Sequence, residues 1–250
     1  MTTSQLTIQE KGRAMKLIVM ALLTFLLPGV GTQAGEFVPG ITGKGIKLGA
    51  AWANVSTNDS VFEEGTAGGF TAGAFLTYSF TPKLSVQPEL LYVEKGTAHG
   101  SFLGGSGYDL SYIEVPVLLK YTFLTDRRLV PSAYFGPAVS SLLSADIYSH
   151  GLFSSSHRYD VKDGMKSLDF GIVFGGEIAI QSMKSVKLIA DLRYTVGLVN
   201  VIDPAKWNAA RKIADEGDWP IHWTDYDRDI VKNDASVKNR AFSIMLGVRF

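Results

Sequence analysis

The last nine residues, 242–250 (FSIMLGVRF), constrain the fold more than any other stretch of the chain. In an extended strand, successive side chains point to opposite faces, so every second residue shares a face. One face of this segment is wholly apolar and the other is small, polar or charged. The apolar set is Phe242, Ile244, Leu246, Val248 and Phe250. Such a face needs an apolar environment, and we expect that environment to be a lipid bilayer.

The beginning of the chain supports export from the cytoplasm. Basic residues precede an 11-residue apolar run at 17–27, and a cleavage-site pattern of small residues follows it. The run is shorter than the ~20 residues that a membrane-spanning helix needs. We therefore expect residues 1–34 to be a signal peptide, with synthesis starting at Met1 or Met15, and residues 35–250 to form the mature domain.

The bulk composition excludes several classes of protein. Of the 250 residues, 46% are hydrophobic, and the 24 basic residues balance the 24 acidic ones. No basic stripe indicates nucleic-acid binding, and the chain has no cysteine for disulfides. No metal-ligand spacing, phosphate-binding loop or dinucleotide fingerprint is present, so we expect neither a metal nor a cofactor.

Segments with period-two alternation recur after the leader, separated by turn residues, which predicts an all-β domain. Eight such segments are found, at 44–54, 67–80, 83–95, 109–124, 130–143, 168–181, 186–199 and 238–250. Eight is the smallest common strand number for a transmembrane barrel, and an even number places both chain ends on one side. We therefore predict an eight-stranded antiparallel transmembrane β-barrel.

Each predicted strand has an apolar face and a polar face, although the alternation does not say which one is inside. The polar face is rich in glycine, serine and threonine, which suits the crowded interior of a narrow barrel. Phe75 interrupts the polar face of its strand. Aromatic residues on the apolar face lie near strand ends, as in an interfacial girdle: Tyr78, Phe80, Tyr92, Tyr121 and Phe123.

The connections alternate in length. Short ones are expected at 81–82, 124–129 and 182–185, and long loops at 55–66, 96–108, 144–167 and 200–237. This alternation is typical of an outer-membrane barrel, whose long loops face outward. The segment 204–217, with proline at its start and glycine at its end, predicts a short helix in the last loop.

Several segments, taken in order, resemble the PorT-like outer-membrane β-barrel family of Gram-negative envelopes. The most specific are Gln87-Pro88-Glu89-Leu90-Leu91-Tyr92 and Tyr112-Ile113-Glu114-Val115-Pro116. The opening strand at 45–49 and the terminal strand are also similar. This resemblance implies an eight-stranded barrel in the outer membrane that is inserted by the barrel-assembly machinery. It implies no biochemical activity, although some family members are parts of export machinery.

Six charged residues fall on the predicted inward face: Glu89, Glu114, Lys120, Glu177, Asp191 and Arg193. Charges that are buried together must pair and hydrogen-bond, because an unpaired buried ion costs several kcal/mol. Two interpretations remain open. The set is either an ion path or proton-sensitive gate, or a structural network that fills the narrow lumen.

Aromatic residues gather in the last loop among acidic ones: Trp207, Trp219, Trp223 and Tyr226. Exposed aromatic side chains among acidic ones are suited to a protein partner, a stacked glycan or a cation. The alternative is that the tryptophans pack the loop onto itself or anchor it to lipid headgroups. Both interpretations stay open.

Three functions are consistent with the sequence. We favour a structural or binding barrel that acts through its extracellular loops, within an export complex or another envelope assembly. A small porin or channel is the alternative, with a water path past Glu114 and Lys120. A lipid-modifying enzyme would use Ser156 and His157, with Asp160 or Asp163 as the orienting acid. Adjacent serine and histidine in a loop are a weak signal, so we expect no enzyme.

Overall fold

We describe a computed structural model of the chain. The residues that the structure describes are 37–58, 66–101, 104–125, 128–151, 154–183, 185–209 and 234–250. The predicted signal peptide lies outside these ranges and stays a prediction.

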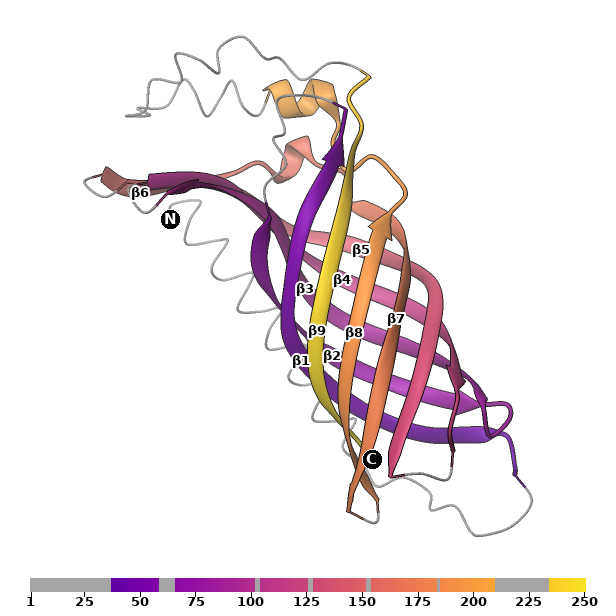
Figure 1. The fold of residues 1–250 in the computed structure, drawn as a ribbon. Coiled ribbons are helices and arrows are strands. Elements are labelled where there is room, and N and C mark those ends of the chain that lie inside the picture. The colour runs from indigo at the N-terminus through magenta and orange to yellow at the C-terminus, as the bar shows by residue number, and fades with distance from the viewer. Residues whose placement is uncertain are drawn as a thin grey trace.

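Eight strands form a closed antiparallel barrel, which confirms the predicted fold (Figure 1). The ring is closed because each barrel strand pairs with two neighbours, including the first strand with the last and β4 with β5. The barrel strands are β1 (Gly40–Thr57), β2 (Ala67–Ser79), β3 (Leu84–Ser101), β4 (Gly104–Thr122), β5 (Leu129–Gly151), β7 (Leu168–Met183), β8 (Val186–Gly197) and β9 (Val237–Arg249).

The terminal segment is the strand that closes the barrel. In Figure 1, β9 lies between β1 and β8. Its pairing with β1 runs without a register shift from Gly45 opposite Arg249 to Thr57 opposite Val237. Because a shift of one residue would turn the apolar face inward, the alternation of residues 242–250 fixes this register.

The apolar face of every barrel strand points outward, which settles the question that alternation left open. Leu246 and Phe174 are 65% and 47% exposed, whereas Gln87 and Glu177 are 0% and 1% exposed. A soluble barrel would show the opposite arrangement. Phe75 lies inside the lumen, and this inward position explains why it interrupts the polar face of its strand.

Aromatic pairs mark the two ends of the outward apolar band. Near the short turns, the rings of Tyr78 and Phe80 are 5.2 Å apart, and those of Tyr121 and Phe123 are 5.4 Å apart. Toward the opposite rim, the rings of Trp52 and Phe242 are 6.1 Å apart. This arrangement fits the girdles that bound the hydrocarbon region of an outer-membrane barrel.

Two of the predicted long loops are mostly strand, so their prediction as loops was wrong. The strands β3 and β4 continue through much of 96–108, and β5 continues to Gly151 before the short strand β6 (Ser154–Asp160). Among the described residues, β6 pairs only with β5, and together they lead away from the barrel (Figure 1). The outer parts of β3, β4 and β5 thus form, with β6, a four-stranded protruding sheet.

The remaining described connections are compact. A 3₁₀ turn, η1 (Lys162–Gly164), precedes β7, and a short helix covers residues 204–209. The rest of the predicted helix at 204–217 lies outside the described residues. Within the described part of the chain, no helix has the length and apolar character needed to cross a membrane.

Candidate functional site

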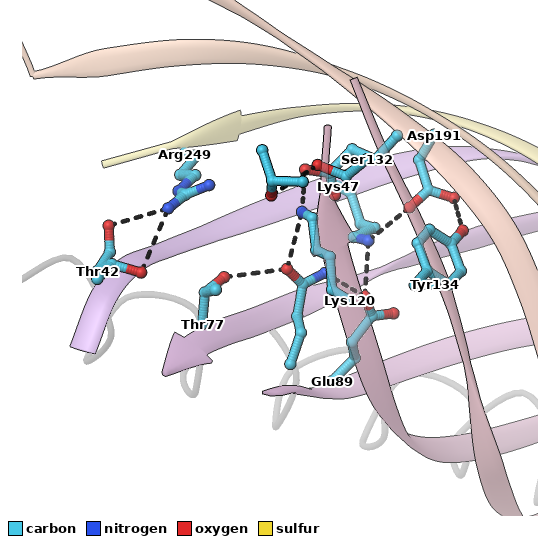
Figure 2. Close-up of polar contacts among 12 residues, drawn as sticks. Thr42, Lys47, Thr77, Glu89, Lys120, Ser132, Tyr134, Asp191 and Arg249 are labelled. Atoms are coloured by element: carbon cyan, nitrogen blue, oxygen red, sulfur yellow. Dashed lines mark hydrogen bonds and ion pairs between the residues drawn. The ribbon is translucent and has the colours of Figure 1, made fainter. Parts of the chain in front are cut away.

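The barrel lumen holds a central network of two cations and two carboxylates, all buried. Lys47 donates to Glu89 (Nζ–Oε1, 2.7 Å) and to Asp191 (Nζ–Oδ2, 2.8 Å). Arg193 donates to the same two carboxylates, at 2.8 Å from Glu89 Oε2 and 2.9 Å from Asp191 Oδ2. The Tyr134 hydroxyl also donates to Asp191 at 2.8 Å (Figure 2). The four charges cancel, and each is held by more than one partner.

A second network lies nearer the rim with the short turns. Lys120 forms a buried ion pair with Glu177 and donates to Gln87 Oε1 at 3.3 Å. Gln87 joins this network to the central one, because its amide nitrogen donates to Glu89 at 2.8 Å. Thr77 donates to Gln87 at 3.0 Å and completes the group (Figure 2).

A third network lies nearer the opposite rim. Lys95 donates to Glu114 at 2.8 Å, and Ser140 donates to the same carboxylate oxygen at 3.1 Å. Close to them, Asn239 donates to Asp169 at 2.8 Å and to the Tyr112 hydroxyl at 3.3 Å. Polar side chains therefore fill the lumen at three successive levels.

Aromatic rings inside the barrel lie against three of its buried cations. Lys47 lies 5.0 Å from the Phe75 ring centre, Lys95 lies 5.0 Å from that of Tyr112, and the Arg193 guanidinium lies 5.5 Å from that of Tyr134. The negative face of a ring attracts a cation, and more strongly where water is excluded. Each of these cations thus has both a carboxylate and a ring in contact.

All six charged residues predicted to face inward are buried in the lumen, and the structure brings them into these three networks. The prediction missed the cations Lys47 and Lys95 and the ring of Tyr134. A signal for Lys47 was present, because it has the opposite parity to its apolar neighbours Ile46 and Leu48. Lys95 was harder to find, since two apolar residues that also face inward separate it from Glu89.

An apolar cap closes the rim opposite the short turns. It joins residues on the connections before β7 and after β8 to inward-facing residues of the barrel rim. Its members are Val55, Leu110, Tyr112, Leu142, Ala145, Val161, Val201, Ile202, Trp207, Ala235 and Val237. Figure 1 shows η1 and the helix at 204–209 above this end of the barrel.

Backbone hydrogen bonds hold the two connections of the cap together. Lys166 N donates to Val201 O at 2.8 Å, and Asp203 N donates to Gly164 O at 3.1 Å. Val201 N donates to Val237 O at 2.9 Å, which ties the cap to β9. A side chain at Gly164 would lie 2.9 Å from the Trp207 Cα, so only glycine allows this close approach.

Trp207 is 3% exposed, and its ring centre lies 5.5 Å from that of Tyr108. Its assignment to an exposed partner surface is therefore corrected, because the helix at 204–209 turns this ring into the cap. Trp219, Trp223 and Tyr226 lie outside the described residues, and a partner surface there stays a prediction.

Ser156 and His157, the residues that a lipid-modifying enzyme would use, both lie in the strand β6. Asp160, at the end of β6, accepts a hydrogen bond from Lys162 N at 2.9 Å. Within the described ranges, no group of three or more histidine, cysteine or acidic residues is arranged to hold a metal ion.

Comparison with known proteins identifies the family of this chain. Residues 42–203 match the family model described as outer membrane protein beta-barrel domain. No curated protein matches the chain.

Several solved structures are similar to the chain at low sequence identity. Ail, the attachment invasion locus protein of Yersinia pestis, is 12% identical (TM-score 0.39; 85% of this chain and 100% of that one are covered). Neisserial surface protein A is 17% identical (TM-score 0.40; 83% and 97% covered). The outer membrane protein OprG of Pseudomonas aeruginosa is 14% identical (TM-score 0.42; 84% and 97% covered).

Proposed function

Because the chain belongs to the outer membrane protein β-barrel domain family, and so lies in the outer membrane, we propose that it is a filled barrel that binds an envelope partner through its outward parts. The observation that carries this proposal is the filled lumen. Three paired polar networks and the cap occupy the interior, as expected for eight strands, whose interior is just wide enough for side chains.

The protruding sheet supports the second half of the proposal. It extends β3, β4 and β5 well beyond the rim, and β6 adds a strand whose second edge pairs with nothing in the described part of the chain. A sheet edge of this kind presents unpaired backbone groups, which a partner chain can use. The resemblance to PorT-like barrels favours a partner within an export complex.

The experiment compares the intact chain with two variants in which the β3–β4 hairpin or the β5–β6 hairpin is shortened to the level of the rim. Each chain is expressed in its native outer membrane, cross-linked to nearby proteins and purified together with them. We expect a defined partner with the intact chain and its loss in at least one variant. Equal cross-linking by all three chains would contradict the proposal. A shift in gel mobility on heating confirms that each variant remains a folded barrel.

A further inference from the structure

Two cations point outward at the edge of the lipid-facing surface that lies farthest from the short turns. Arg240 and Lys238 lie on the same face of β9 as the outward residue Phe242. Arg240 is exposed and Lys238 is half-buried. Within the described residues, no hydrogen bond or ion pair satisfies either side chain, which contrasts with the paired cations of the lumen.

Uncharged residues of β1 and β8 lie beside these two cations. In the pairing register, Arg240 lies opposite Asn54 on β1 and Val196 on β8, and Lys238 lies opposite Ser56 on β1. One flank of the pair is therefore polar and uncharged, and the other is apolar. No acidic residue stands directly across from either cation in this register.

Aromatic residues form the next row toward the membrane. Phe242 lies opposite Trp52 on β1 and opposite Tyr194 on β8. Trp52 is 42% exposed, and its ring centre lies 6.1 Å from that of Phe242. Aromatic side chains prefer the boundary between hydrocarbon and headgroups, so this row marks the level of the interface.

The length of β9 places the boundary between hydrocarbon and headgroups at the same height, independently of the aromatic row. Its outward face is apolar from Phe250 to Phe242 and becomes basic at Arg240. With a rise of about 3.3 Å per residue and a strand tilt of about 40°, the apolar part spans roughly 20 Å, and Arg240 lies near the end of the roughly 25 Å band of such barrels. The two cations therefore lie at headgroup depth.

We propose that Arg240 and Lys238, with Asn54 and Ser56 beside them, bind the phosphate of an anionic outer-leaflet lipid whose acyl chains lie on Trp52 and Phe242. A guanidinium forms paired hydrogen bonds with a phosphate, and an ammonium adds a point charge. The lipid, rather than free phosphate, is the occupant because the aromatic row continues the site into the hydrocarbon. This site is separate from the partner-binding role of the protruding sheet.

Hydrogen bonds fix the chain around the proposed site at the end of β1. Asn58 accepts a hydrogen bond from Ser236 N at 2.7 Å and donates to Asp234 O at 3.4 Å. These contacts hold the chain that leads into β9 against the end of β1, directly above Lys238. The two strands that carry the proposed ligands are thus fixed relative to each other.

The test measures lipid retention by native mass spectrometry on the full-length barrel, released from nanodiscs of phosphatidylcholine that contain lipid A. We expect bound lipid A on the wild type and a loss on the order of tenfold in the Arg240→Gln/Lys238→Gln double variant. The matched control is Lys44→Gln, which removes a cation from the outward face near the opposite rim. Equal retention by the double variant, or an equal loss in the control, would overturn the site.

A second measurement needs no charge variant. Trp52 fluorescence, isolated as the difference between wild type and Trp52→Phe, is followed in vesicles with brominated acyl chains. We expect stronger quenching by brominated phosphatidylglycerol than by brominated phosphatidylcholine. Equal quenching by the two lipids contradicts the proposal. Displacement of lipid A by inorganic phosphate alone would likewise contradict it, because it would assign the site to free phosphate.

Discussion

At the scale of single residues, the central charges of the barrel interior are held in ion pairs. Lys47, Glu89, Asp191 and Arg193 form a group with no net charge, and each member contacts both residues of opposite sign. Removing two charges from water is costly, and their attraction offsets that cost only where the geometry is good and further hydrogen bonds are made. Tyr134 and Gln87 supply such bonds.

The pair of Lys120 and Glu177 gives a prediction at this scale. Lys120→Met leaves the Glu177 carboxylate buried without its cation, so we expect the free energy of unfolding to fall by about 3–5 kcal/mol. The double variant Lys120→Met/Glu177→Leu removes both charges and should recover most of this loss. Urea unfolding of the barrel in vesicles, followed by tryptophan fluorescence, measures both.

The control for this pair is Lys83→Met at the exposed turn before β3, which should change stability by less than about 0.5 kcal/mol. If the single and double variants were equally destabilised, the loss would come from packing, and the buried ion pair would not be the cause.

At the scale of elements, the cap is the feature that most distinguishes this chain from an open barrel. Two connections far apart in sequence, before β7 and after β8, meet over the rim through the bridge between Met165 and Ile202. Trp207 provides the largest ring of the cap. These apolar contacts lie next to the third lumen network, because Tyr112 belongs to both.

The cap gives a second prediction, at Gly164. A methyl group there meets the Trp207 backbone at 2.9 Å, so Gly164→Ala should push the helix at 204–209 away from the rim. We expect faster hydrogen exchange at the Asp203 amide, which donates to Gly164 O. The matched control is the exposed neighbour Lys166→Ala. Unchanged exchange at Asp203 in Gly164→Ala would show that the close approach does not hold the cap.

At the scale of the whole molecule, the sequence predicted the barrel and much of its interior because both depend on strict alternation. The number of strands and the set of charged residues that share one face follow from period two. The direction of the faces did not, since alternation is the same for a soluble barrel. The structure shows the direction, because apolar residues such as Leu246 and Phe174 point outward.

The parts that the sequence did not predict depend on contacts between distant segments. The sequence of the protruding sheet is rich in glycine and serine and has no sustained period-two apolar pattern, so local alternation did not predict its strands, which pair with one another. The burial of Trp207 depends on the meeting of two loops, which no local pattern records. Lys95 was hidden because the inward face of its strand also carries Leu91 and Val93.

The central claim is that the lumen is filled, and single-channel recording tests it most directly. Residues 35–250 are reconstituted into planar bilayers, and insertion is verified by the change in gel mobility on heating. We predict silent, correctly inserted barrels, because paired side chains and the cap occupy the interior. A steady conductance that changes with Glu114→Gln or Lys120→Gln would contradict the account and make this protein a channel.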